Sequence, residues 1–179
     1  MLSATGLPLL LHPSDAVGGE ALDGYGHALP IALGFPFETT VGVTRLVLAG
    51  VLTRHPGLRV IASHGGGTLP FLAHRLDAVW RSSPDARARL DSEPPSEALA
   101  RVYVDTIVYG DGPLSAMRDL VPDAHAMYGT DHPFSVADPQ INRDVLDRAP
   151  GTTELTVDGG VGNARRLFGL PLAARAVVG

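Results

Sequence analysis

The stretch Leu58-Arg-Val-Ile-Ala-Ser-His64-Gly65-Gly66-Gly67 decides the fold, because an apolar run ends on a histidine followed by three glycines. A continuous apolar run of this length is typical of a strand buried on both faces of a parallel sheet. The glycines predict a tight loop, and Pro70 suits the first turn of a helix. The stretch therefore predicts one strand, loop and helix unit of a parallel α/β fold.

Two further apolar runs end on residues that can bind a metal. Leu7-Pro-Leu-Leu-Leu-His12 ends on a histidine that Pro13 holds out of the helical conformation. Ala124-His-Ala-Met-Tyr-Gly-Thr-Asp131 ends on a carboxylate. Because ligands of parallel α/β folds bind where the strands stop, we expect His12, His64 and Asp131 to meet in one pocket.

Strand-like and helix-like segments alternate along the whole chain, as in βαβ units. The expected strands are residues 7–12, 58–63, 101–107 and 125–129. The expected helices are residues 38–54, one beginning near Pro70, 113–120, one beginning at Pro139 after a cap at Asp138, and 161–168. Residues 82–100 read as an insertion over the active face. We predict one domain, residues 1–179, with four β/α units and no internal repeat.

The composition excludes several classes of function. The 179 residues carry a net charge of -5, which gives no electrostatic footprint for nucleic acid or an anionic membrane surface. Cysteine and lysine are both absent, so thiolate sites, Schiff-base lysines and metal-bridging modified lysines are excluded. No window approaches the ~18 apolar residues of a membrane span. We expect a cytoplasmic protein without a membrane partner, whose metal would be held by nitrogen and oxygen.

Each candidate residue also has an ordinary structural interpretation. His12 is a metal ligand or a hydrogen-bonded histidine at a strand end, and His64 is a catalytic group or the cap of a tight turn. Asp131 can bind metal, accept a proton from bound water or cap a turn, and His132 could take its role. Asp105 fits a hydrogen-bonding acid of the core. The surface or helix ends are the expected places for the remaining histidines, His27, His55, His74 and His125.

The glycine-rich turn also suggests a place for the substrate. Gly65 and Gly66 lack side chains, so a ligand can approach the backbone closely. Amide groups at the start of the next helix offer a site for a substrate carboxylate. Arg75 on that helix fits a solvated arginine or one that contacts another subunit.

Five segments together resemble the amidohydrolase superfamily, in particular the branch related to aminocarboxymuconate-semialdehyde decarboxylase. They are Leu-His12-Pro13; Pro56-Gly-Leu-Arg-Val-Ile-Ala-Ser-His64-Gly-Gly-Gly67 through Pro70 and Arg75-Leu-Asp77; Val104-Asp105-Thr106; Gly129-Thr-Asp131-His-Pro133; and Asn163-Ala-Arg-Arg-Leu-Phe168. The order and spacing of these segments follow the family, and the resemblance covers nearly the whole chain.

The resemblance implies the second half of a metal-dependent (β/α)₈ barrel of the TIM type. His12 and Asp131 would be metal ligands, and His64 and Asp131 would be catalytic, with His64 holding and helping to deprotonate a metal-bound water. Gly65, Gly66 and Arg75 would bind the carboxylate of a small-molecule substrate. The expected metal is zinc, with manganese, iron or cobalt as alternatives because all four accept nitrogen and oxygen ligands.

One departure from the family concerns its first strand, which carries a His-x-His pair. None of the seven histidines here has another two positions away. Four β/α units are half of a closed barrel, and a half barrel leaves unpaired strand edges that invite association. The sequence leaves open a truncated product, a separate amino-terminal half, or a homo-oligomer.

The first function that the resemblance implies is decarboxylation of a small unsaturated or aromatic carboxylic acid. The alternative is hydrolysis of a small lactone, ester or amide. A third possibility, of another class, is a catalytically inactive fragment or interaction module that keeps the fold.

Overall fold

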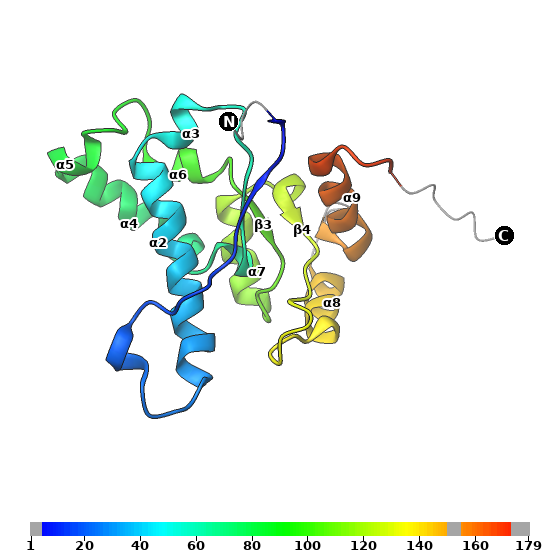
Figure 1. The fold of residues 1–179 in the computed structure, drawn as a ribbon. Coiled ribbons are helices and arrows are strands. Elements are labelled where there is room, and N and C mark those ends of the chain that lie inside the picture. Colours follow the sequence, from blue (N-terminus) through cyan, green and yellow to red (C-terminus); the bar gives the residue numbers. More distant parts are fainter. Residues whose placement is uncertain (1–4, 150–154, 173–179) are drawn as a thin grey trace.

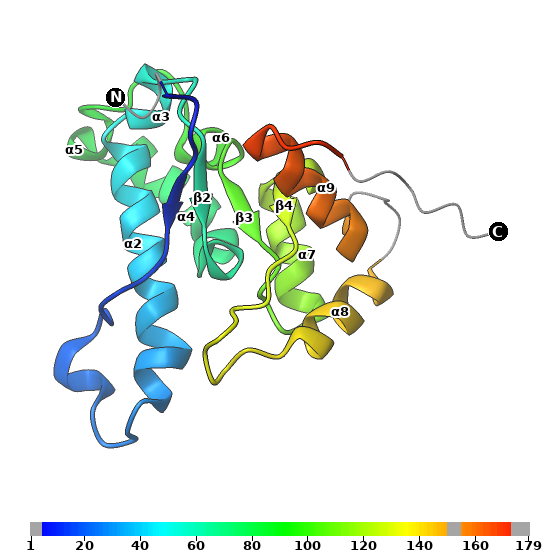
Figure 2. The same cartoon turned by 45° about the vertical axis from the view of Figure 1, so that its right-hand side comes forward.

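Four short strands form one parallel sheet in the computed structural model, which describes residues 5–149 and 155–172. The strands β1 (Leu9–Leu11), β2 (Val60–Ala62), β3 (Tyr103–Asp105) and β4 (Ala126–Met127) lie side by side in sequence order. Leu10 pairs with Ile61. All three pairings are parallel, so the carboxyl ends of the strands share one edge of the sheet (Figures 1 and 2). The predicted parallel α/β fold is confirmed.

Helices follow each strand and connect it to the next. The α-helices are α2 (Phe35–Leu48), α3 (Val51–Arg54), α4 (Leu69–Ser82), α5 (Pro84–Arg87), α6 (Pro95–Leu99), α7 (Asp111–Leu120), α8 (Pro139–Arg148) and α9 (Val157–Phe168). The other helical segments are the 3₁₀ turns η1 (Gly19–Leu22), η3 (His64–Gly66) and η4 (Asp123–His125) and the π-helical segment η2 (Pro30–Gly34). The expected cap of α8 is present, because the Asp138 side chain accepts a hydrogen bond from the Ile141 amide.

The main hydrophobic core lies between the sheet and the helices α2, α4 and α7. Val60 and Ala62 of β2 are buried in this core, and Val43 and Met117 reach it from α2 and α7. Successive side chains of a strand point to opposite faces. Ile61, between the two core residues, therefore packs on the other face, in a smaller cluster completed by Met127, Leu167, Tyr103 and Ala164.

Two predicted helices have different bounds in the structure. The run predicted as 38–54 is divided, because Gly50 ends it in a left-handed conformation with φ of 66°. A Cβ at Gly50 would lie 2.3 Å from the Arg89 carbonyl oxygen, so only glycine fits there. The last helix begins at Val157 rather than at 161, since Thr156 caps it and Gly160 lets it approach Tyr128 closely.

Residues 82–100 do not cover the active face, and that prediction is wrong. The segment contains α5 and α6, which lie near the end where the strands begin (Figure 1). The Trp80 indole donates a hydrogen bond to the Leu90 carbonyl, and Asp77 accepts one from the Ser96 amide. These contacts fold the segment back against α4, on the side opposite the carboxyl ends of the strands.

The prediction that no window approaches the apolar length of a membrane span is wrong for one helical run. Residues Pro30–Leu48 are long and apolar enough, by length and composition alone, to cross a membrane. In the structure this run is a helix beside the sheet, and Val43 and Val47 of its second half are fully buried in the main core. Its first half extends past the carboxyl end of β1 (Figure 2).

Glu93 and Arg101 form a bidentate ion pair away from the sheet edge. Nη1 and Nη2 of Arg101 each donate to the Glu93 carboxylate at 2.6 Å, and the Thr53 hydroxyl adds a third hydrogen bond. The hydrogen bonds from Arg101 hold the pKa of Glu93 below its usual value. A carboxylate of lowered pKa stabilises the fold above the ordinary pKa and loses that effect as the pH falls through the folded-state value.

We expect Glu93→Gln to lower the free energy of unfolding by about 0.5–1 kcal/mol at neutral pH. The change is modest because solvent screens the attraction between Glu93 and the partly exposed Arg101. The difference from wild type should shrink below the ordinary carboxyl pKa of 4.5. Urea unfolding of both proteins, at neutral pH and below pH 4.5, measures the difference in free energy. A difference that does not change with pH would contradict the assignment.

Candidate metal centre and cavity

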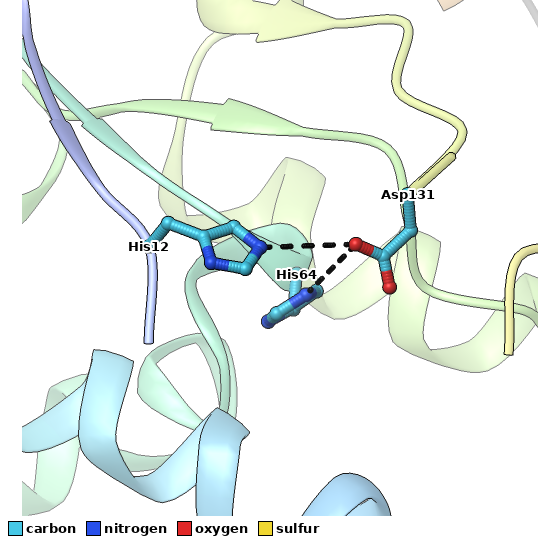
Figure 3. A group of neighbouring side chains, drawn as sticks. All are labelled: His12, His64 and Asp131. Atoms are coloured by element: carbon cyan, nitrogen blue, oxygen red, sulfur yellow. Dashed lines mark ion pairs between the residues drawn. The ribbon is translucent and has the colours of Figure 1, made fainter. Parts of the chain in front are cut away.

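Three side chains with metal-binding atoms meet at the carboxyl edge of the sheet. His12 directly follows β1, His64 follows β2 and Asp131 follows β4. Figure 3 shows both imidazoles turned toward the Asp131 carboxylate. Its Oδ1 lies 3.8 Å from Nε2 of His12 and 3.7 Å from Nε2 of His64. The structure thus brings together the three residues that the sequence singled out.

A hydrogen bond to the backbone fixes the tautomer of the His12 ring. Nδ1 of His12 lies 3.0 Å from the carbonyl oxygen of Pro13, which can only accept a hydrogen bond. In the neutral ring Nδ1 therefore carries the proton, and the Nε2 lone pair faces Asp131. Two acceptors that face each other at 3.8 Å need a cation or a proton between them. This is the arrangement of a metal ligand whose second nitrogen is held by the backbone.

His64 is held differently, because its ring makes no hydrogen bond with any residue that the structure describes. Nε2 faces Asp131, and Nδ1 is buried without a hydrogen-bond partner among the described residues. The direction of this imidazole depends on the backbone that carries it.

The backbone at the site is strained at three places. His64, Tyr109 and Asp131 are the non-glycine residues with positive φ in the described ranges, at 57°, 57° and 58°. All three line the same cavity. A left-handed conformation costs a residue with a Cβ roughly 1–2 kcal/mol, and such strain concentrates at functional sites.

The three residues lie in a cavity of about 930 Å³, a size suited to a small molecule. Apolar side chains form most of its wall, namely Ala28, Ile31, Ala32, Phe35, Ile107, Val108, Phe134 and Val136. The Phe134 ring stacks on His12 with centroids 5.8 Å apart. The Tyr109 hydroxyl donates to the Val136 carbonyl at 3.1 Å and so joins two loops that line the cavity. Burial raises the pKa of Tyr109, and the Asp131 carboxylate adds to this effect.

Two carboxylates fasten the loops behind the histidines. Glu38 accepts hydrogen bonds from the amides of Ser14 and Asp15, just after His12, at 2.8 and 2.7 Å. Asp105, at the end of β3, accepts hydrogen bonds from the amides of His64 and Gly65 at 2.9 and 3.0 Å. Burial raises the pKa of Asp105, against the opposing effect of these N–H donors. The expected role of Asp105 as a hydrogen-bonding acid is confirmed.

The donor set fits a divalent cation. One nitrogen from each histidine and one Asp131 oxygen lie within 4.8 Å of one another. Two ligands that each lie about 2.1 Å from one ion are roughly 3–4 Å apart, close to the spacings around Asp131. Nitrogen and oxygen donors suit zinc or manganese.

The proposed substrate-binding residues are not gathered in the cavity. Gly65 and Gly66 lie beneath it, where a Cβ would contact Val108 or Val104, and the Gly65 amide already binds Asp105. Gly67 is the glycine of this turn that lines the cavity. Arg75 is exposed on α4, outside the cavity lining.

The remaining histidines lie on the surface or at helix ends, as expected. His27, His55 and His74 are exposed, and His55 ends α3. His125 ends the helical turn η4 and is half-buried there, stacked on Tyr103 with centroids 4.2 Å apart. Burial lowers the pKa of His125.

A sequence model of a known family covers nearly all of this chain. The model described as Amidohydrolase matches residues 1–170. The chain belongs to the amidohydrolase family. The resemblance seen in its five sequence segments is confirmed.

Two curated members of the family are similar to the chain over part of their length. The 2-amino-3-carboxymuconate-6-semialdehyde decarboxylase of Dictyostelium discoideum is 30% identical over 74% of this chain and 36% of its own length. The 6-methylsalicylic acid decarboxylase of Penicillium expansum is 31% identical over 74% of this chain and 40% of its own length. The chain thus spans well under half of either relative.

Solved structures of the family place the fold. The apo form of IDCase from Metarhizium anisopliae has a TM-score of 0.81 and 33% identity, covering 93% of this chain and 49% of that one. A dihydroxybenzoic acid decarboxylase from Polaromonas, solved with manganese and an inhibitor, has a TM-score of 0.79 and 22% identity. The match covers 99% of this chain and 54% of that one. The four β/α units correspond to about half of such TIM-barrel chains, as predicted.

Strain at His64 predicts an unusual order of stability. We expect the free energy of unfolding of His64→Gly to exceed that of His64→Ala by about 0.5–1 kcal/mol. Glycine adopts positive φ without strain, and this gain outweighs the larger entropy that glycine has in the unfolded chain. Both variants lack the imidazole, so the difference between their free energies of unfolding reports the backbone conformation at residue 64.

The same pair at Arg75, in the helical conformation of α4, should give the opposite order, with alanine more stable by about 1 kcal/mol. Chemical denaturation measures both pairs. Greater stability of His64→Ala over His64→Gly would contradict the strain.

Proposed function

We propose that this chain carries the metal centre of a carboxy-lyase that decarboxylates a small unsaturated or aromatic carboxylic acid. The observation that carries the proposal is the meeting of His12, His64 and Asp131 in a mainly apolar cavity. The decarboxylase names of the relatives support the same reaction class. Because the chain spans only part of those relatives, the activity of the whole enzyme is included in the proposal.

The cavity favours a flat, largely apolar acid. Phe134 and Phe35 offer aromatic surface on its wall, and Ile107 and Val136 add aliphatic contacts. Burial of such a ring is favourable at roughly 25 cal/mol per Å². The acid group would then lie toward His12 and Asp131, which bring metal-binding atoms to the cavity wall.

Three residues would share the chemistry. His12 and Asp131 would hold a divalent cation, which when bound supplies Lewis-acid polarisation of substrate oxygens and lowers the pKa of water. Zinc is our first candidate, and the manganese in the Polaromonas decarboxylase supports manganese as its alternative. Decarboxylation breaks the bond between the ring carbon and the carboxylate carbon, and the ring carbon then takes a proton. His64 and Asp131 are the titratable groups placed to carry that proton.

A direct test combines metal content and release of carbon dioxide. We expect about one divalent ion per site after dialysis, and less in His12→Ala. With the acids named in the relatives as substrates, His64→Ala and Asp131→Asn should lose about 100-fold or more of any measured activity. His55→Ala, an exposed histidine at the end of α3, is the matched control and should retain both metal and activity. A folded wild type without metal would contradict the proposal.

The working enzyme, we further propose, contains more β/α units than these four, supplied by an amino-terminal half or by a second copy. The outer edges of β1 and β4 pair with no strand in the described residues, and Leu10 of β1 is 57% exposed. Unpaired strand edges and exposed apolar faces favour association. Sedimentation of the isolated chain should therefore show dimers or larger species. A stable monomer across the concentration range would contradict assembly from two copies, and failure of that monomer to bind a separately expressed amino-terminal half would contradict the other form.

A further inference from the structure

The direction of the His64 imidazole is set by its backbone. Its Nδ1 has no hydrogen-bond partner among the described residues, and its Nε2 lies 3.7 Å from Asp131. The backbone holds a left-handed conformation, with φ of 57° at His64 and 61° at Gly65. A residue with a Cβ leaves this conformation unless other groups hold it there.

Asp105 is the group that holds this turn. Its Oδ2 accepts a hydrogen bond from the His64 amide at 2.9 Å. Its Oδ1 accepts one from Gly65 and one from Ile107, both at 3.0 Å. Both oxygens of one carboxylate therefore bind the turn after β2 and the backbone just after β3. No other described side chain accepts a hydrogen bond from the His64 or Gly65 amide in this way.

Asp105 itself has little room to move. A Cβ built on Gly129 would lie 3.0 Å from the Asp105 Cβ and from two side-chain carbons of Ile107. The loop after β4, which leads to Asp131, therefore packs directly on the residue that fastens His64. Asp105 links the strand ends that carry two of the three site residues.

We propose that Asp105 is a positioning residue, which fixes the left-handed turn at His64 so that the imidazole faces Asp131 and the bound cation. This inference deepens the proposed function and rests on it for the role of the cation. Asp105 is neither in the ligand group nor among the residues that line the cavity, so it would act through His64 rather than on the cation or the substrate.

The isosteric substitution Asp105→Asn tests this directly. An asparagine has the same shape but replaces one acceptor oxygen by an NH₂ donor, which then opposes at least one of the three N–H groups. In the metal-free protein, we expect amide hydrogen exchange at His64 or Gly65 to accelerate about tenfold or more. We also expect the dissociation constant for Mn²⁺ to rise about 10–100-fold, the usual range for residues that orient metal ligands.

Asp77 offers a matched control for general loss of stability. It is also buried and also binds backbone, accepting hydrogen bonds from the amide and hydroxyl of Ser96. It lies near α6, away from the cavity lining. Asp77→Asn should lower the melting temperature and accelerate exchange at Ser96, but leave the Mn²⁺ dissociation constant within about twofold of wild type.

Two results would overturn the inference. One is that Asp105→Asn has the same Mn²⁺ affinity and the same amide exchange at His64 as wild type. The other is that Asp77→Asn loses as much Mn²⁺ affinity as Asp105→Asn does.

If wild type itself binds no Mn²⁺, the proposed function fails, and the exchange of the His64 and Gly65 amides still decides the role of Asp105. If Asp105→Asn does not fold, Gly129→Ala, which presses on Asp105 without removing the carboxylate, should shift both readouts in the same direction, and unchanged readouts would refute the role.

Discussion

Parallel pairing of the four strands is the constraint on which the site depends. Because β1, β2, β3 and β4 run in the same direction in sequence order, whatever follows each strand arrives at one edge of the sheet. His12, His64 and Asp131 follow three different strands, lie far apart in the sequence and meet at this edge. Asp105 arrives from the remaining strand, and it binds the backbone of its neighbour instead of joining the ligand group. Each strand thus delivers one residue, with a separate task, to the same place.

The chemistry of this edge follows from an excess of acceptors. With Nδ1 protonated toward Pro13, the His12 lone pair faces a carboxylate oxygen that also faces His64. Such an arrangement is unfavourable unless a cation or a proton lies among the three atoms. The surrounding apolar wall weakens competition from water and strengthens charge interactions inside the cavity. The positive φ angles at His64, Tyr109 and Asp131 indicate that the fold stores strain here to keep the groups in place.

The sequence was sufficient for the strands and the three central residues, because apolar runs that end on polar residues have a direct meaning in parallel sheets. It failed where tertiary contacts decide. The break at Gly50 depends on the distant Arg89 carbonyl, and the placement of residues 82–100 depends on Trp80 and Asp77. The amides of the glycine turn looked available for a substrate carboxylate, but Asp105, forty residues later, occupies the Gly65 amide. Phe134 directly follows the segment Gly129-Thr-Asp131-His-Pro133, yet only the folded loop shows that it stacks on His12.

The most direct test of the account is the position of a bound ion. Crystals equilibrated with zinc and measured at the zinc absorption edge should give an anomalous peak about 2.0–2.2 Å from Nε2 of His12 and from Oδ1 of Asp131, next to the His64 ring. A peak elsewhere on the chain, or no peak while these three side chains keep their arrangement, would contradict the claim that the strand ends form a metal centre.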